Sequence, residues 1–247
     1  MDTLLLRISG NWGHFKKPET NNNPLTHDFL TKTALIGMVG AVLGKDRESM
    51  RPLFPQLSDD LKYGLVLEKP VKKQAWAFTL RRFEAGRAKL EVSGLSPRPF
   101  EFLKDPCFRV AIALADARSR DLFETFAYLA ANSETHFDPV LGLHNCPAEL
   151  SLVGRGQVEE AEGPFRTAGF VPRSFKPRPE TLAGPFRAGF EWLPSYQNAE
   201  MWNPRDRYVE VVYMDVPRSD ERPYLTGEGT HYQMHMNGVK EEAWCLI

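Results

Sequence analysis

His14, Lys16 and Lys17 form the tightest group of side chains in this chain that could contact an anion. They lie in the segment Gly-Asn-Trp-Gly-His-Phe-Lys-Lys-Pro, residues 10–18. Lysines supply the phosphate contacts that dominate affinity for nucleic acids, and the His14 ring could stack on a base or donate to a phosphate. The plainer interpretation is a turn histidine followed by solvated lysines. We favour contact with a nucleic-acid backbone because the lysines directly follow the histidine.

The next polar residues along the chain admit two interpretations. Asn21, Asn22 and Asn23 carry amides that could read base edges or 2′-hydroxyls, but asparagines also form turns. Lys32 and Thr33 are expected at a helix N-terminus, where backbone N–H groups favour an anion. Thr31 as an ordinary N-cap is the alternative.

A second group of positive charges follows at residues 69–89. Arg81 and Arg82 fall on opposite faces of a predicted strand, so only one of them can face a nucleic acid, and we choose Arg81. The group consists of Lys69, Lys72, Lys73, Arg81, Arg82, Arg87 and Lys89.

A later loop, Pro-Val-Leu-Gly-Leu-His-Asn, contains Gly142 and His144. Glycine lets a backbone approach a phosphate closely, although it also serves in ordinary turns. His144 could contact the same ligand. The chain has no carboxylate, histidine or cysteine cluster at metal-ligand spacing, so we expect neither a metal nor a cofactor.

Composition constrains the class of protein. The chain has 247 residues with a formal net charge of −1, whereas a free-standing nucleic-acid binder is usually basic. Any such binding must therefore use local patches or nucleic acid shared with neighbouring subunits. The three widely spaced cysteines suggest reduced thiols, and neither a signal peptide nor a membrane span is recognisable. We expect a cytoplasmic protein.

Periodicity positions these groups on regular elements. We predict helices from Thr31 or Thr33 to Leu43, within 46–62 (a short helix and loop), and from Ser119 or Arg120 to Ala131. Strands are predicted at 3–9, 61–69, 74–84, 108–116, 148–153 and 207–215. This order is compatible with an α+β, ferredoxin-like (RRM-like) domain over 1–162. Beyond residue 163, dense Pro and Gly indicate a C-terminal β lobe over 163–247.

Two segments carry a family resemblance. GNWGHFKKPETNNNPLTHDFLTKTALIGMVGAVLG (10–44) resembles the opening of the fifth CRISPR-associated protein family (Cas five, RAMP superfamily), and FDPVLGLHNCPAELSLVG (137–154) resembles a later family segment. Leu193-Pro194 followed by Arg207-Tyr208 is a weaker third match. His27 stands where the family usually has Tyr, Leu30–Thr31 replaces a Pro-Pro pair, and Val140 replaces a Tyr. The length of the chain and its motif sequences are most like those of the type I-B form.

The resemblance implies a non-catalytic subunit of the Cascade surveillance complex in antiviral defence. Such a subunit holds the 5′ handle of the CRISPR RNA, caps the backbone, and contacts the backbone and large subunits, so that it meets target DNA only indirectly. A β-hairpin thumb is expected at about 70–105. The expected RNA contacts are His14, Phe15, Lys16, Lys17, Asn21, Asn22, Asn23, Thr26, Lys32, Thr33, Arg81, Gly142 and His144.

Two other functions stay open from the residues. The type I-C branch of the family cuts precursor RNA without a metal, and His14, Lys16 and His144 could supply the base, acid and cation for that chemistry. A protein-only scaffold is the third alternative, and it would tolerate charge reversal at Lys16 and Lys17.

Overall fold

The computed structural model describes residues 1–20, 22–79, 97–180, 186–194, 208–215, 223–236, 238 and 242–247. It is a mixed α and β structure, rich in sheet. The helices are α1 (Lys32–Val42), α2 (Arg47–Asp60) and α3 (Arg120–Ala131), with 3-10 turns at Ala117–Ser119 and Arg173–Phe175. The strands are β1 (Asp2–Ser9), β2 (Trp12–Gly13), β3 (Leu61–Leu67), β4 (Lys73–Thr79), β5 (Pro97–Lys104), β6 (Cys107–Leu114), β7 (Glu149–Ala161), β8 (Pro164–Thr167), β9 (Val171–Pro172), β10 (Arg178–Pro179), β11 (Ala188–Pro194), β12 (Tyr208–Met214), β13 (Leu225–Glu228), β14 (His231–His235) and β15 (Ala243–Trp244).

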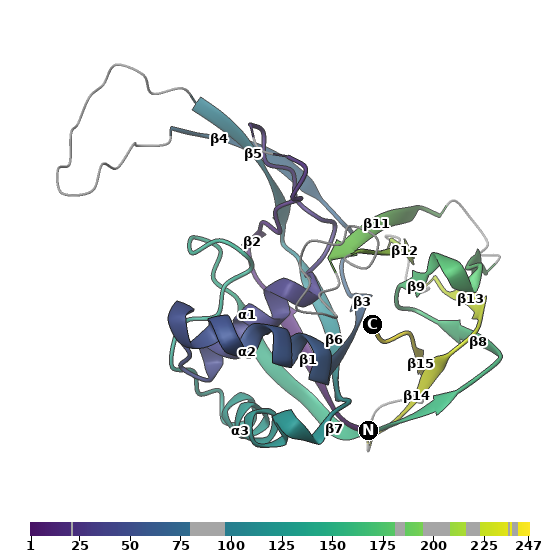
Figure 1. Cartoon of the computed structure of the whole chain (residues 1–247). Helices are drawn as coiled ribbons and strands as arrows, with labels where there is room; N and C mark the ends of the chain where they lie inside the picture. Colours follow the sequence, from purple (N-terminus) through teal and green to yellow (C-terminus); the bar gives the residue numbers. More distant parts are fainter. Residues whose placement is uncertain are drawn as a thin grey trace.

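A six-stranded sheet forms the centre of the molecule, in the order β15-β14-β7-β1-β6-β3. Its neighbouring strands are antiparallel throughout. The connection from β1 to β3 runs through α1 and α2, and the connection from β6 to β7 runs through α3. Figure 1 shows the three helices together on one side of this sheet.

Strand β1 is apolar on both faces because both faces of the sheet are covered. Leu4, Leu6 and Ile8 belong to the larger core, together with residues of α1 and α3. Leu5 points the other way, into a smaller core that contains Tyr232 of β14 and Trp244 of β15. The two-residue period of a strand explains this division.

Helices α1 and α3 agree closely with their predicted bounds. Thr31 caps α1 by accepting a hydrogen bond from the Ala34 N–H, and Gly44 follows the helix in the left-handed region at φ +68°. The prediction that small residues let α1 pack closely holds for Gly40, which contacts Met50 of α2. Gly37 is exposed with open space around it. Helix α2 is longer than the predicted short helix and loop.

A long hairpin, β4–β5, projects from the body of the molecule (Figure 1), and we call it the thumb. It lies within the predicted 70–105 excursion, while residues 80–96 lie outside the described residues. Strand β2 pairs with β5, with Trp12 opposite Lys104. The thumb sheet is therefore attached to the segment that follows β1.

The C-terminal half forms two small sheets, β10-β13-β8 and β11-β12-β9. The expected strand at 207–215 corresponds to β12. Strand β7 is longer than the predicted 148–153 because it continues to Ala161, where β14 pairs with its last five residues. In the part of the chain that the structure describes, no helix has the length and apolar character needed to cross a membrane.

Candidate nucleic-acid interface

The basic loop between β2 and α1 is closed by backbone hydrogen bonds. The Lys17 N–H donates to the Leu25 carbonyl at 2.9 Å, and the His27 N–H donates to the Phe15 carbonyl at 2.8 Å. Lys16 forms an isolated bridge with Thr26. We call residues 14–28 the basic loop. Its base is fixed against the thumb, because β2 immediately precedes it.

The His14 ring is buried, with an exposed fraction of 2%. Its Nδ1 donates to the Glu101 carbonyl of β5 at 2.7 Å, and the ring packs against Phe100 and Phe102. Burial lowers the pKa of His14 below its ordinary 6.5, which favours the neutral ring. In this conformation the ring holds the loop to the thumb, and its predicted contact with RNA stays a prediction.

Phe15 and Thr26 are buried as well and fix the two sides of the basic loop to each other. The Phe15 N–H donates to Thr26 Oγ1 at 2.8 Å, and that hydroxyl donates to the His27 carbonyl at 3.0 Å. The Thr26 N–H donates to Glu101 Oε1. Both residues therefore position the loop.

The polar tip of the loop faces solvent. Lys16, Asn22 and Asn23 are exposed, and Asn21 lies outside the described residues. Lys17 is partly buried, and its ammonium forms an ion pair with Glu191 of β11 at 3.0 Å. The loop therefore presents Lys16 and the asparagines outward, while Lys17 also anchors the loop.

Glu191 and Asp28 join the basic loop to the C-terminal half and to the thumb. Buried Glu191 accepts hydrogen bonds from His27 Nδ1 at 2.9 Å and from the Asp28 N–H at 2.9 Å. The Asp28 carboxylate accepts from Lys73 of β4 at 2.6 Å and from the Tyr213 hydroxyl. These contacts fix three separate parts of the chain around the loop.

The start of α1 is closed to solvent at Lys32, which is 2% exposed. Burial lowers its pKa to about 8, and the charge of Asp59 opposes this shift. The Thr33 hydroxyl lies 2.9 Å from that of Thr31. Thr31 serves as the N-cap, as the alternative interpretation held. Contacts of Lys32 and Thr33 with an anion stay predictions.

The Gly142 loop packs directly on the basic loop. The His14 N–H donates to the Leu141 carbonyl at 2.9 Å, and Gly142 adopts φ +90°. A Cβ built at Gly142 would lie 2.0 Å from the His14 carbonyl oxygen. From the sequence, a phosphate was expected close to the Gly142 backbone. In this structure the group that lies close to Gly142 is the backbone carbonyl of His14. His144 on the same loop is exposed.

Aromatic rings stabilise the root of the thumb. Trp12 packs edge-on against Trp76 at 5.2 Å, and Phe78 packs against Phe100 and Phe102 at 5.7 and 5.6 Å. Trp76 and Phe78 share one face of the predicted strand. Arg81 lies outside the described residues.

Comparison with known proteins identifies the chain's relatives. A family model described as CRISPR-associated protein (Cas_Cas5) matches residues 3–211. The chain belongs to this CRISPR-associated family. No curated protein matches its sequence. A crystal structure of a CRISPR protein from Archaeoglobus fulgidus shares the fold, with a TM-score of 0.58 and 13% identity over 99% of this chain and 98% of that one. A chain of a CRISPR RNA-guided surveillance complex also matches, with a TM-score of 0.47 and 12% identity over 86% of this chain and 90% of that one.

In this Cas_Cas5 chain the predicted residues divide into two sets. The structure brings His14, Phe15, Thr26 and Gly142 together as packed supports of the basic loop, and it leaves Lys16, Asn22, Asn23 and His144 at the surface. Sequence reasoning missed Glu191, which lies 164 residues from His27. No local pattern marks Glu191, because its importance comes only from the fold. Among the described residues, no three His, Cys, Asp or Glu side chains form a metal-binding group.

Proposed function

We propose that this CRISPR-associated protein is a non-catalytic Cascade subunit of the type I-B kind that binds the 5′ handle of the CRISPR RNA. Its core is proposed to be ferredoxin-like. The strand order β7-β1-β6-β3 and the connections through α1, α2 and α3 support this, because they form an antiparallel β-α-β-β-α-β unit. RNA-recognition modules use the same arrangement.

The observation that carries the proposal is the attachment of the basic loop to a projecting thumb within a CRISPR-associated family member. Strand β2 joins the basic loop to the thumb, so RNA held by the basic loop would also contact the thumb. Exposed Lys16, Asn22, Asn23 and His144 are proposed to contact the RNA directly. The other proposed members of the interface are His14, Phe15, Lys17, Asn21, Thr26, Lys32, Thr33, Arg81 and Gly142, of which the buried ones support the loop.

The proposed partners are the Cascade backbone subunit and large subunit, with target DNA met indirectly. The near-neutral charge supports a protein that shares its RNA with neighbours. Exposed aromatic residues support protein contacts, since large apolar side chains at the surface often mark interfaces. They are Phe186, Phe190 and Trp192, on or beside β11. We retain the proposed division into 1–162 and 163–247, in which β14 of the second part pairs with β7 of the first and β15 pairs with β14.

Binding is better supported than RNA cleavage by the same fold. A general base must reach the proton that it removes. The His14 ring is buried, and its Nδ1 is engaged by the Glu101 carbonyl. The exposed loop residues are suited to holding phosphates instead.

The test combines filter binding with a denaturing gel, using labelled precursor repeat RNA in EDTA. We expect the wild type to retain RNA intact and Lys16→Glu to weaken retention by at least about tenfold, because a charge-assisted phosphate contact becomes a repulsion. Arg51→Glu, an equal charge change on exposed α2, is the control and should bind as the wild type does. Lys17 is left unchanged because it anchors the loop through Glu191. Discrete cleavage would favour the endoribonuclease alternative. Absence of binding, even with the backbone and large subunits co-expressed, would contradict the proposal.

A further inference from the structure

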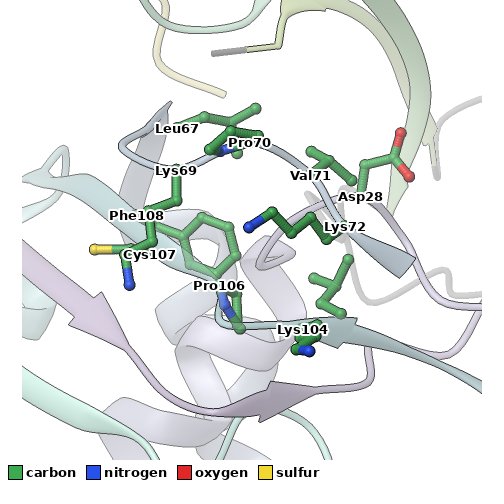
Figure 2. A pocket seen from close by; sticks show the side chains of 11 residues that line it. Asp28, Leu67, Lys69, Pro70, Val71, Lys72, Lys104, Pro106, Cys107 and Phe108 are labelled. Carbon is green, nitrogen blue, oxygen red and sulfur yellow. The ribbon is translucent and has the colours of Figure 1, made fainter. Parts of the chain in front are cut away.

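A shallow hollow that opens to solvent lies at the root of the thumb. It is bounded on one side by the connection between β3 and β4 and on the other by the turn between β5 and β6 (Figure 2). Pro106 and Phe108 contribute apolar surface, while Lys69, Lys72 and Lys104 supply positive charge at exposed positions. Figure 2 shows the Lys72 ammonium pointing into the hollow.

The backbone on both sides of the hollow is fixed. The Glu68 N–H, one residue before Lys69, donates to the Cys107 carbonyl at 2.9 Å. The Lys104 N–H donates to the Lys72 carbonyl at 2.8 Å. The three lysines therefore extend from segments that hydrogen bonds hold together. Because folding already orders these segments, binding of a ligand does not have to order them.

The hollow carries uncompensated positive charge. Within the part of the chain that the structure describes, no carboxylate forms an ion pair with Lys69, Lys72 or Lys104, whereas Lys17 and Lys73 both have acidic partners. Asp28 also lines the hollow, but its carboxylate is already engaged by Lys73 and by the Tyr213 hydroxyl. Three ammonium groups without acidic partners attract an anion with several acceptor oxygens.

We propose that this lysine hollow binds a phosphate of the RNA backbone. The inference rests on the proposed function and specifies a second point at which the protein holds the RNA. A phosphodiester offers the acceptor oxygens that lysine ammonium groups bind as point charges. RNA held by the basic loop and by the hollow would cross the root of the thumb.

The salt dependence of RNA binding tests the hollow directly. For single strands, log K falls with log[salt] by a slope of about 0.7 for each neutralised phosphate. We expect Lys69→Gln/Lys72→Gln/Lys104→Gln to reduce the slope by at least about 0.7 between about 50 and 200 mM salt, with at least about tenfold weaker binding at the low end. Lys45→Gln/Arg47→Gln/Arg51→Gln removes three cations near the start of α2 and should keep the wild-type slope. Lys72→Gln alone should also reduce the salt slope and weaken RNA binding.

Each outcome has a distinct meaning. If the triple lysine variant keeps the wild-type salt slope while the wild type binds RNA, the proposed phosphate site in the hollow is wrong. The proposed function would still stand. Failure of the wild type to bind RNA would reject both. A free phosphate compound is the other source of such an anion. A thermal shift with inorganic phosphate that equals the shift with RNA, and that disappears in the hollow variant, would assign the site to a small molecule and overturn the RNA proposal.

Discussion

Replacing Gly142 with alanine is expected to destabilise the protein by about 2–5 kcal/mol. Gly142 adopts φ +90°, where an L side chain is strained, and the new methyl would lie 2.0 Å from the His14 carbonyl oxygen. A backbone atom cannot move aside as a flexible side chain can. The loop from 137 to 147 must then separate from the basic loop, which breaks the hydrogen bond from the His14 N–H to Leu141. Chemical denaturation followed by fluorescence measures the loss.

The matched control is Gly37→Ala in α1. Gly37 is exposed and a Cβ there meets nothing within 4 Å, so alanine should stabilise the helix by up to about 1 kcal/mol. Equal stability of the two variants would contradict the packing described here. A Gly142→Ala protein that folds normally but loses RNA would instead indicate that the glycine approaches a phosphate, as the sequence had suggested.

The sequence predicted the elements whose signals are local. Helix α3 was expected from Ser119 or Arg120 to Ala131, and the structure has it at Arg120–Ala131, because its apolar residues recur at helical spacing. The α1 bounds followed from a threonine cap and a terminal glycine. Strand β7 was predicted too short, since the expected strand ended at residue 153, before the acidic residues at 157–161. Its pairing with β14 keeps this run in the sheet, with most of its acidic side chains exposed.

The burial of the site residues could not be predicted from the sequence. In the sequence His14 is a turn residue close to two lysines, and only the fold places Phe100 and Phe102 around it. Lys32 is a polar residue at a helix start, yet the chain buries it. Lys17 similarly forms an ion pair with Glu191, which lies on a strand far along the chain. Non-local contacts of this kind depend on tertiary packing, so they cannot be predicted from composition and periodicity.

Replacing Glu191 with alanine is expected to cost about 3–5 kcal/mol of stability. The side chain is 1% exposed and accepts from His27 Nδ1, the Asp28 N–H and the Lys17 ammonium. Removing it leaves the buried His27 ring and the Asp28 N–H without their acceptor and separates the basic loop from β11. Glu124→Ala is the control, because its ion pair with Arg155 lies at the surface and should contribute less than about 1 kcal/mol. Equal losses in the two variants, measured by denaturant unfolding, would contradict the anchoring role of Glu191.

The same carboxylate gives the protein a pH dependence of defined sign. Burial alone would raise the pKa of Glu191, but the His27 hydrogen bond and the charges of His27 and Lys17 outweigh it and lower the pKa below the ordinary 4.5. A carboxyl whose pKa is lower in the folded state stabilises the fold above its unfolded pKa, and this stability is lost as the pH falls through the folded value. The free energy of unfolding should therefore fall on acidification below about pH 4.5 more steeply in the wild type than in Glu191→Gln. Other paired acids such as Asp60 and Glu68 titrate in both proteins, so the difference between the two curves isolates Glu191. Parallel curves would show that the Glu191 carboxylate is not held by its partners in solution, and the basic loop would then need another anchor.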